Sequence, residues 1–467
     1  MSSLITTVNP ATGQPLAAYE AWDGPRIETA VERAHTASRS WALVPVAERA
    51  ARVARLARTL REHAGRLADL AVTEMGKPVA EAAGEVEKSA LTADYYARRG
   101  PGILADERVS VEDAEAWVAY EPAGLVLAVM PWNFPVWQVM RFAIPSLVAG
   151  NGILLKHASN VTGSALALQD LFVAAGFPAH LVTALVIADT DVPKVTAGLV
   201  EDDRIAAVTL TGSNRAGAAV GAAAGRAAKK SVLELGGSDA FVVLADADVD
   251  RAAAAAVKAR FANAGQSCVC AKRFVVHEAV AEDFTAAFVR GVEHLRIGDP
   301  RERSTQVGPL ARDDLRAAIQ RQVEESVAAG ARLLTGGQPV PGDGYFFRPT
   351  VLADTGPGMA AFDEETFGPL AALTVAQDDE DAVRLADATA FGLGLSVWTA
   401  DAARGVGLAR RITSGAAFVN AVVASDPRLP FGGTKRSGYG RELAAAGIRE
   451  FTNTRTYWVA ARSRPGR

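Results

Sequence analysis

The spacing of hydrophobic residues changes several times along the chain. The opening stretch "TTVNPATGQPLAAY" alternates apolar and polar residues around a Pro and a Gly, which predicts two short strands joined by a turn. Between residues 25 and 100, segments such as "ERAARVARLARTLREHAGRLADLAV" place Leu and Val at helical spacing. This region is therefore predicted to form long amphipathic helices.

Residues 107–130 return to strand chemistry with an acidic turn, and after them short β runs alternate with helical segments. "GNGILLKH" and "RIAAVTLTG" each precede a helical stretch, which predicts βαβ units around a parallel sheet. A second α/β unit begins near "SVLELGGSDAFVVLADADVD" and continues to about residue 420. The alternating "FTNTRTYWVA" predicts a final strand, able to pair between subunits with a strand near residue 115, and so indicates an oligomer.

Composition narrows the class of protein. The chain has 467 residues, is 49% hydrophobic and carries a net charge of −4, which indicates a large core in two or three domains. It shows no basic stripe for nucleic acid, no secretory leader, and no apolar run near the roughly 20 residues of a membrane span. Two cysteines do not make a disulfide framework. We expect a soluble, cytoplasmic protein without nucleic-acid or membrane partners.

Both cysteines lie in "NAGQSCVC", which spans residues 263–270. A thiol with a pKa of about 8.5 is only a few per cent thiolate at neutral pH, yet that fraction is a strong nucleophile. Small and polar neighbours favour a nucleophilic Cys268, and an inert buried cysteine is the alternative that local chemistry leaves open. C-x-C alone supplies too few ligands for a metal, so no metal site is expected.

Three other motifs carry polar groups suited to catalysis or binding. Glu234 ends an apolar strand in "LELGG", where burial prepares a carboxylate to act as a base, unless it is an ordinary cap or edge residue. Asn133 in "MPWNFP" is held among aromatics and prolines, either to donate to an oxyanion or as a structural turn residue. "TLTGSNRAG" puts Gly212 and Ser213 at a strand-to-helix junction that favours a phosphate, although a plain glycine turn looks the same.

The order of these motifs is more specific than any one of them. "PWNFP", "TGSNRAG", "LELGG" and "NAGQSC" are followed by "EETFGP" and "PFGGTKRSGYGRE". In this the chain resembles the aldehyde dehydrogenase superfamily from "NPATGQ" to the final strand, and within it the succinate-semialdehyde dehydrogenases. The resemblance implies an α/β fold with a Rossmann-like cofactor domain, an α/β catalytic domain and a β-hairpin oligomerisation element, assembled as a homodimer or homotetramer.

The resemblance also implies a division of the chain. It assigns residues 1–106 and 123–233 to a dinucleotide-binding domain and residues 234–426 to a catalytic domain. Residues 107–122 and 450–464 form the oligomerisation strands, and residues 427–449 return to the cofactor domain.

The catalytic roles implied by the resemblance fall on three residues. Cys268 attacks the aldehyde carbon and forms a thiohemiacetal, whose oxyanion is held by the Asn133 amide and the Cys268 backbone N–H. Hydride transfer to a nicotinamide then leaves a thioester. Glu234 activates the water that hydrolyses this thioester to a carboxylic acid.

The cofactor residues are carried over in the same way. The family positions that contact the cofactor match Trp132, Asn133, Lys156, Gly212, Ser213, Leu235, Glu365 and Phe367. Members that prefer NAD commonly carry a glutamate three residues after the lysine, where this chain has Ser159. Without that carboxylate, Lys156 is able to pair with a 2′-phosphate, so we expect NADP to be preferred and NAD to be possible.

The substrate residues follow from the succinate-semialdehyde dehydrogenases. Arg141 matches their arginine that binds the far carboxylate, and Ser425 and Arg428 in "ASDPRLPFGG" match their second substrate loop. A further arginine of some members, six residues before the nucleophile, is Ala262 here, so the binding of the carboxylate must differ in part. We expect succinic semialdehyde as substrate. The alternatives are a different or broad aldehyde specificity and, for Arg141, an ion-paired helix residue.

The second thiol has a candidate role of its own. "SCVC" looks like the C-x-C of succinate-semialdehyde dehydrogenases in which two thiols form a reversible disulfide, here Cys268 and Cys270. On an extended stretch, residues i and i+2 lie about 6.5 Å apart, near the upper limit for bridging. The alternative is that Cys270 is only a small buried side chain.

Two other functions disagree with the residues present. Dehydrogenases that pass the acyl group to coenzyme A generally lack the glutamate that corresponds to Glu234. A catalytically silent binding or structural protein of the same fold predicts the loss of Cys268, Glu234 or Asn133, and all three are present.

Overall fold

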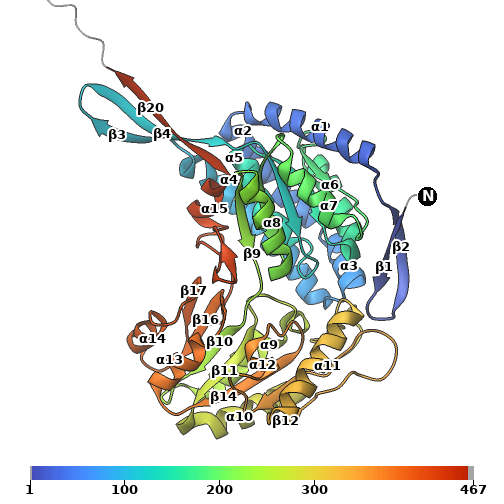
Figure 1. Cartoon of the computed structure of the whole chain (residues 1–467), viewed down its shortest axis with the longest axis vertical. Coiled ribbons are helices and arrows are strands. Elements are labelled where there is room, and N and C mark those ends of the chain that lie inside the picture. The colour runs from blue at the N-terminus through green and yellow to red at the C-terminus, as the bar shows by residue number, and fades with distance from the viewer. Residues whose placement is uncertain (1–2, 461–467) are drawn as a thin grey trace, which may run out of the picture.

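The computed structural model of the chain describes residues 3–460 and shows two α/β bodies with a small sheet projecting from one of them (Figure 1). The bodies lie one above the other in this view, and the N-terminal strands lie beside the upper body. Positions 461–464 of the predicted oligomerisation segment 450–464 lie outside the described residues.

The first body is built on a largely parallel sheet. Its strand order is β19-β9-β8-β5-β6-β7, with β19 antiparallel to β9 and the other pairs parallel. These strands are β5 (Leu125–Met130), β6 (Gly152–His157), β7 (Val182–Ala184), β8 (Ile205–Thr211), β9 (Lys230–Glu234) and β19 (Gly438–Tyr439). The alternation of short β runs and helices thus produces the predicted parallel βαβ arrangement.

Helices cover both faces of this sheet, because its strands are apolar on both sides. In β5, Val126 and Ala128 pack into one apolar cluster, and Leu125 and Leu127 pack into the other. The predicted helical region of residues 25–100 is confirmed. The helices of this body are α1 (Gly24–Ala42), α2 (Val46–Glu62), α3 (Ala64–Met75), α4 (Val79–Ile103), α5 (Trp137–Ala149), η1 (Ser159–Val161), α6 (Thr162–Ala174), α7 (Val192–Glu201) and α8 (Asn214–Arg226).

The second body contains the other large sheet, in the order β12-β13-β14-β11-β10-β16-β17. Only the edge pair β12–β13 is antiparallel among the described strand pairs of this sheet. Its strands are β10 (Asp239–Val243), β11 (Ala271–His277), β12 (Arg332–Thr335), β13 (Thr350–Ala353), β14 (Leu370–Ala376), β16 (Gly394–Trp398) and β17 (Ala416–Val419). Its helices are α9 (Val249–Phe261), η2 (Ala262–Gly265), α10 (Glu278–Glu293), α11 (Asp313–Ala328), α12 (Ala360–Asp363), α13 (Asp379–Asp387) and α14 (Ala402–Ala409).

The projecting sheet corrects one expectation. It consists of β3 (Glu107–Val111), β4 (Ala114–Pro122) and the C-terminal β20 (Thr452–Ala460), with β4 in the centre. The final strand therefore pairs with the strand near residue 115 inside one chain, over nine residue pairs, whereas we expected these two strands to pair between subunits. The reason is the chain path: the preceding helix α15 (Ala444–Glu450) packs on α5 and delivers β20 to the free edge of β4.

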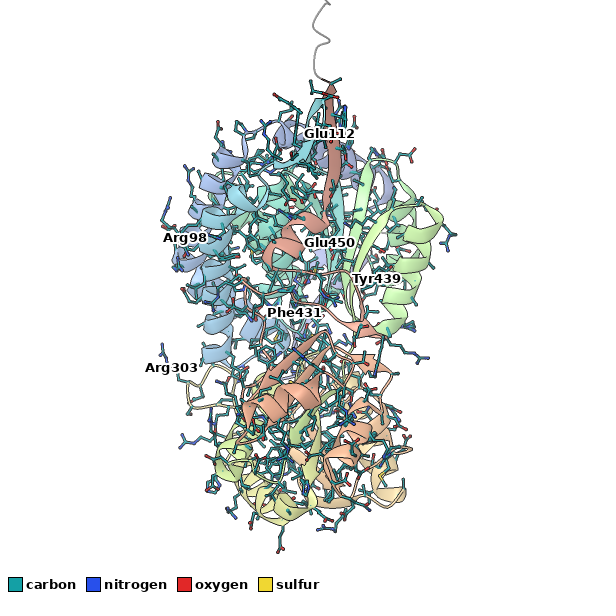
Figure 2. All side chains as sticks on the ribbon, turned by 90° about the vertical axis from the view of Figure 1, so that its left-hand side faces the viewer. Arg98, Glu112, Arg303, Phe431, Tyr439 and Glu450 are labelled. Carbon is teal, nitrogen blue, oxygen red and sulfur yellow. The ribbon has the colours of Figure 1, made fainter. Side chains whose placement is uncertain are left out.

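The segment before α15 returns to the first sheet. Gly438 pairs with Glu234 at the end of β9, and Phe431 and Tyr439 lie near the junction of the two bodies (Figure 2). A Cβ at Gly438 would overlap the carbonyl of Leu233, and φ is +111° there, so only glycine fits. The remaining strands are the hairpin of β1 (Leu4–Asn9) with β2 (Gln14–Glu20) and the pair of β15 (Phe391–Gly392) with β18 (Thr434–Lys435).

Candidate active site

The predicted nucleophile follows a strained turn. Asn263, Ala264 and Gly265 all have left-handed backbone, with φ of 54°, 53° and 73°, which costs roughly 1–2 kcal/mol at a residue such as Ala264. The Asn263 backbone N–H donates to the Glu81 carboxylate at 2.7 Å, and this contact with α4 helps to hold the turn. The turn leaves Cys268 partly exposed at the junction of the two bodies.

The surroundings of Cys268 favour the protonated thiol over the thiolate. Burial raises its pKa to about 12, and the negative charges of Glu365 and Glu234 act in the same direction. Arg141 and Lys272 oppose this shift but do not overcome it. The thiol must therefore lose a proton to a base, or change its surroundings, before it attacks a substrate.

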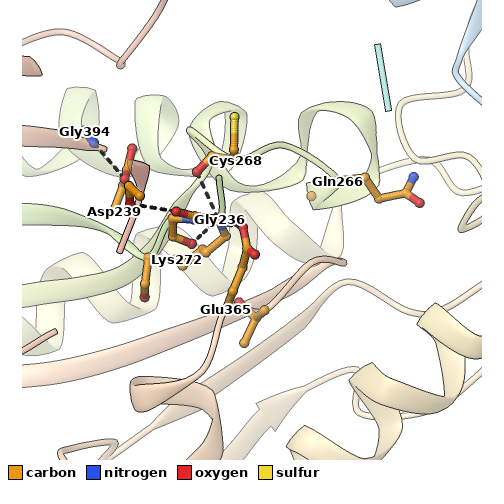
Figure 3. Close-up of polar contacts among 12 residues, drawn as sticks. Gly236, Asp239, Gln266, Cys268, Lys272, Glu365 and Gly394 are labelled. Atoms are coloured by element: carbon orange, nitrogen blue, oxygen red, sulfur yellow. Dashed lines mark hydrogen bonds and ion pairs between the residues drawn. The ribbon is translucent and has the colours of Figure 1, made fainter. Parts of the chain in front are cut away.

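The backbone carbonyl of Cys268 is held by a lysine (Figure 3). Lys272 Nζ donates to the carbonyls of Gly237 at 2.6 Å and Cys268 at 3.0 Å, and forms an ion pair with Glu365 at 3.3 Å. The Cys268 sulfur points to the opposite side of the loop. Glu365 accepts from the Gly237 N–H at 3.0 Å. A Cβ at Gly236 would overlap the Glu365 carboxylate, and a Cβ at Gly237 would overlap the Cys268 carbonyl, which explains the two glycines of "LELGG".

Asn133 is linked to the segment that leads to the nucleophile. Its side-chain Nδ2 donates to the Gln266 carbonyl at 3.1 Å, and its own carbonyl accepts from Asn263 Nδ2 at 2.8 Å. The side chain is buried, and an amide nitrogen carries two hydrogens, so one N–H remains for a further acceptor. This arrangement is suited to the oxyanion role predicted for Asn133.

Glu234 is a buried carboxyl at the end of β9. Burial raises its pKa well above the ordinary value, and the neighbouring carboxyl of Glu442 adds to the effect. Neither carboxyl oxygen of Glu234 has a hydrogen-bond partner within residues 3–460. When ionised, such a carboxylate is a strong base, and its free oxygens are available to a water, as a general base requires.

Arg141 has its charge compensated within the protein. Its guanidinium forms a fully buried ion pair with Glu442, donates to Thr211 Oγ1 at 3.2 Å and stacks over the Phe431 ring at 4.6 Å. Glu442 lies in "SGYGRE", far from α5 in the sequence, and was not identified from the sequence. The geometry agrees with the alternative interpretation of Arg141 as an ion-paired helix residue.

Three charged residues on one face of α4 contact three parts of the site. They were not identified from the sequence. Besides the contact of Glu81 described above, the Glu85 carboxylate accepts from the backbone N–H groups of Val136 and Trp137, both at 2.8 Å. Lys88 donates to Ser425 Oγ at 2.7 Å. The spacing i, i+4, i+7 in "EAAGEVEK" was the available signal, since charged residues on the inward face of an amphipathic helix are unusual.

The predicted cofactor residues Trp132 and Phe367 lie against each other. Their rings meet edge to face with centroids 5.7 Å apart, and they pack with Met75, Val161 and Ala311. Together they present an aromatic surface beside the loop that carries Glu365.

Lys156 and Ser159 lie at the end of β6. Lys156 is mostly buried and makes no ion pair with any residue that the structure describes, and burial lowers its pKa. A buried ammonium group without an ion-pair partner fits the phosphate of a dinucleotide. Ser159 Oγ donates to the Asp189 carboxylate at 3.0 Å, and both line a cavity of about 480 Å³. Asp189 was not identified from the sequence.

The strand-to-helix junction after β8 is also formed as expected. Gly212 N–H donates to the Glu234 carbonyl at 2.9 Å, and Ser213 caps α8 by accepting from the Ala216 N–H at 3.3 Å. A Cβ at Gly217 would overlap the Leu235 side chain, which places this turn directly against the catalytic strand.

The structure separates the two predicted residues of the second substrate loop. Ser425 contacts Lys88, whereas the Arg428 side chain is 74% exposed and forms an ion pair with Asp426 at 2.7 Å. Arg428 therefore points into solvent in this structure.

Cys270 is a free, buried thiol. Burial raises its pKa, with Arg260 and Lys272 opposing the shift. Its backbone N–H donates to the Ser267 carbonyl at 3.3 Å, so residues 267–270 form a turn. The extended geometry that we assumed for the Cys268–Cys270 pair is therefore wrong, because the strained turn before Cys268 continues into this second turn.

Within residues 3–460, no group of three or more His, Cys, Asp or Glu side chains is arranged to hold a metal ion. None of the described helices is long and apolar enough to cross a membrane.

Comparison with known proteins gives consistent matches over the whole chain. Residues 1–457 match the model of the aldehyde dehydrogenase family. The chain is 46% identical over 452 residues to succinate semialdehyde dehydrogenase (NAD(P)+) Sad of Escherichia coli strain K12, covering 97% of each protein. It is 45% identical over 456 residues to a probable succinate-semialdehyde dehydrogenase (NADP(+)) of Synechocystis, covering 98% of this chain and 100% of that protein.

A solved structure gives the same picture. The crystal structure of succinic semialdehyde dehydrogenase from Streptococcus pyogenes in complex with NADP+ superposes with a TM-score of 0.94 at 33% identity, covering 98% of this chain and 100% of that chain.

The buried Arg141–Glu442 ion pair leads to a prediction about stability. Arg141→Met leaves the Glu442 carboxylate buried without a partner, which is expected to lower the free energy of unfolding by about 3–5 kcal/mol. The double variant Arg141→Met/Glu442→Leu removes both charges and is expected to recover most of this loss. Unfolding midpoints in urea measure both effects. An unchanged midpoint for Arg141→Met would show that the ion pair does not stabilise the protein.

Proposed function

The chain belongs to the aldehyde dehydrogenase family and is an NAD(P)-dependent aldehyde dehydrogenase, and from this premise we propose that it oxidises succinic semialdehyde to succinate with NADP as the preferred cofactor. The observation that carries the proposal is the convergence of Cys268, Asn133 and Glu234 at the junction of the two bodies. The names of the curated relatives support the choice of aldehyde.

The first step requires a thiolate and an oxyanion site. The Cys268 thiol gives its proton to a water molecule, which carries it to solvent, and the thiolate sulfur attacks the aldehyde carbon to form a thiohemiacetal anion. The Asn133 amide and the Cys268 backbone N–H donate to this oxygen, and each such donor contributes about 3–4 kcal/mol to transition-state stabilisation. Arg141 and Lys272 favour the thiolate through their positive charge.

The second step returns the enzyme to its starting state. The chemistry that a bound nicotinamide supplies is hydride acceptance, which leaves the acyl group on Cys268 as a thioester. Glu234 takes a proton from a water, the hydroxide oxygen attacks the thioester carbonyl, and the carbon–sulfur bond breaks. The raised pKa of Glu234 makes its carboxylate a stronger base for this step. The carboxylic acid leaves, and the Cys268 sulfur is free again.

The cofactor site contains features for both nicotinamides. Lys156 and the absence of a carboxylate at Ser159 favour a 2′-phosphate, as in NADP. Asp189 places a carboxylate beside Ser159, where it is able to accept hydrogen bonds from ribose hydroxyls. The site is therefore also able to bind NAD. The roles proposed for the other cofactor residues, Trp132, Asn133, Gly212, Ser213, Leu235, Glu365 and Phe367, follow the family pattern.

Substrate binding is proposed to involve Arg141, Ser425 and Arg428. Arg141 retains N–H groups beside Cys268 although Glu442 compensates its charge, and Ser425 carries a hydroxyl in the same region. Arg428 reaches a substrate only if it leaves Asp426 and turns inward.

The subunits are proposed to assemble as a homodimer or homotetramer in the cytoplasm, without nucleic-acid or membrane partners. Support for assembly comes from the projecting sheet, whose edge strands β3 and β20 carry the exposed side chains of Val109, Trp458 and Val459. The domain division given by the resemblance is proposed as well, with the return of β19 to the first sheet in its support.

The mechanism predicts different behaviour for two variants. Glu234→Gln is expected to produce one equivalent of NADPH per active site in a rapid burst and then to turn over about 10²–10⁴-fold more slowly, because the thioester forms but is not hydrolysed. Cys268→Ala is expected to show no burst. Stopped-flow absorbance of NADPH and intact-protein mass measure the two steps. A Glu234→Gln variant with normal steady-state turnover would contradict the role of Glu234.

The cofactor proposal predicts opposite effects of two substitutions. Ser159→Glu restores a carboxylate and is expected to lower kcat/KM with NADP on the order of 10- to 100-fold relative to NAD. Asp189→Asn removes a carboxylate from the cavity and is expected to raise kcat/KM with NADP relative to NAD. Asp191 is an exposed carboxylate outside the cavity, so Asp191→Asn serves as the matched control. A wild-type enzyme with a clear NAD preference would overturn the NADP proposal.

We also propose that Cys268 and Cys270 form a reversible disulfide that switches the enzyme off, and substitution of the second thiol tests this. After hydrogen peroxide treatment, the wild-type enzyme is expected to regain activity with a dithiol, because the Cys270 thiol attacks the sulfenic acid on Cys268, releases water and forms a reducible disulfide. Cys270→Ala lacks this protection and is expected to lose activity irreversibly. Recovery of the two proteins to the same extent would end the proposal.

A further inference from the structure

Lys88 is a cation in the site to which no role has been given. It lies on α4 one turn after Glu85, on the face that also contacts the nucleophile turn and the start of α5. Its Nζ donates to Ser425 Oγ at 2.7 Å and lies 4.4 Å from the centre of the Trp137 ring. The Lys88 side chain thus extends from α4 toward α5 and the loop that follows β17.

The charge of Lys88 is available to a ligand, unlike that of the neighbouring arginines. Arg141 is paired with Glu442 in the buried interior, and Arg428 is paired with Asp426 and exposed. Lys88 makes no ion pair within residues 3–460, although Asp426 is close enough to influence it. A half-buried ammonium group without an ion-pair partner is unusual, and an anionic ligand would balance it.

Lys88 is also close to the reacting atom. The Lys88 ammonium lies over the Trp137 ring, Cys268 packs against the apolar cluster that contains this ring, and the charge of a Cys268 thiolate acts on Lys88. A short substrate bound covalently at Cys268 therefore extends toward Lys88 if its chain follows the Trp137 ring.

We propose that Lys88 and Ser425 bind the distal carboxylate of the aldehyde substrate, with the Trp137 ring against the methylene groups between the carboxylate and the aldehyde. The Ser425 hydroxyl accepts from Lys88, so its own hydrogen is free to donate to a carboxylate oxygen. The site is thereby selective for short ω-carboxy aldehydes. This inference rests on the function proposed above and adds the residues that select the substrate.

The proposal predicts a particular pH dependence. Burial and the positive charge of Arg141 lower the pKa of Lys88 to about 8, while Glu85 on its own helix, Asp426 on the facing loop and Cys268 oppose the shift. Because the ammonium form binds the carboxylate, KM for succinic semialdehyde is expected to rise above pH 8. KM for an uncharged aldehyde is expected to lack this rise. Titration of Cys268 and Glu234 affects both substrates alike, so its effect is removed when the ratio of the two KM values is taken.

The central experiment compares succinic semialdehyde with butanal, an uncharged aldehyde of the same chain length. Lys88→Met keeps the length of the side chain and removes its charge, and is expected to lower kcat/KM for succinic semialdehyde on the order of 10- to 100-fold, mainly through KM. Butanal oxidation is expected to change by less than about threefold. Lys88→Arg is expected to restore most of the preference for the carboxylate.

A control and a binding assay complete the test. Arg98→Met removes a positive charge from the exposed side of the same helix and is expected to leave both substrates unaffected (Figure 2). The product succinate is expected to slow alkylation of Cys268 by iodoacetamide in the wild-type enzyme but not in Lys88→Met. This assay needs no turnover.

The outcomes separate the two proposals. If the wild-type enzyme oxidises succinic semialdehyde no better than butanal, the proposed substrate and the role of Lys88 both fail. If the wild-type enzyme prefers succinic semialdehyde and Lys88→Met keeps that preference and the succinate protection, only the role of Lys88 fails. Equal loss of activity toward both aldehydes would show a structural role for Lys88 and would also overturn the inference.

Discussion

The site depends on the left-handed turn at residues 263–265, directly before Cys268. Such backbone is unfavourable for L-residues, so contacts from elsewhere must hold it. Glu81 supplies one of them from a position 182 residues away, and the same face of α4 binds the first N–H groups of α5 through Glu85. The nucleophile loop, the Asn133 loop and α5 are thus positioned by a single helix, and a shift of α4 would disturb all three together.

Charge compensation is the second organising feature of the site. Glu234 and Glu442 are two buried carboxyls close to each other, and Arg141 is the cation that balances them. Burial keeps the Cys268 thiol protonated in this environment, and it keeps Glu234 able to bind a proton. Proton transfer within this group therefore responds strongly to any change in local charge, such as the arrival of a charged substrate or cofactor.

The sequence was sufficient where function resides in consecutive residues. "NAGQSC", "LELGG" and "MPWNFP" identified the groups that the structure brings together, because each encodes a backbone shape as well as a side chain. The partners of these groups were not found. Glu442, Asp189 and Lys88 were not found from any motif, because their importance arises from contacts between distant segments. Asp189 contacts Ser159 across 30 positions, and Lys88 contacts Ser425 across 337.

The hydrophobic pattern by itself determined the parallel βαβ bodies, the N-terminal helices and the last strand, since alternation and helical spacing are local properties of a chain. Tertiary structure decided which edge the last strand joins, which charges are neutralised and how the two thiols are presented. β20 pairs with β4 of the same chain, Arg141 is paired with Glu442, and residues 267–270 form a turn where an extended stretch was expected. These features depend on segments that meet only after folding, and the balance of burial and charge at their meeting point cannot be read from either segment alone.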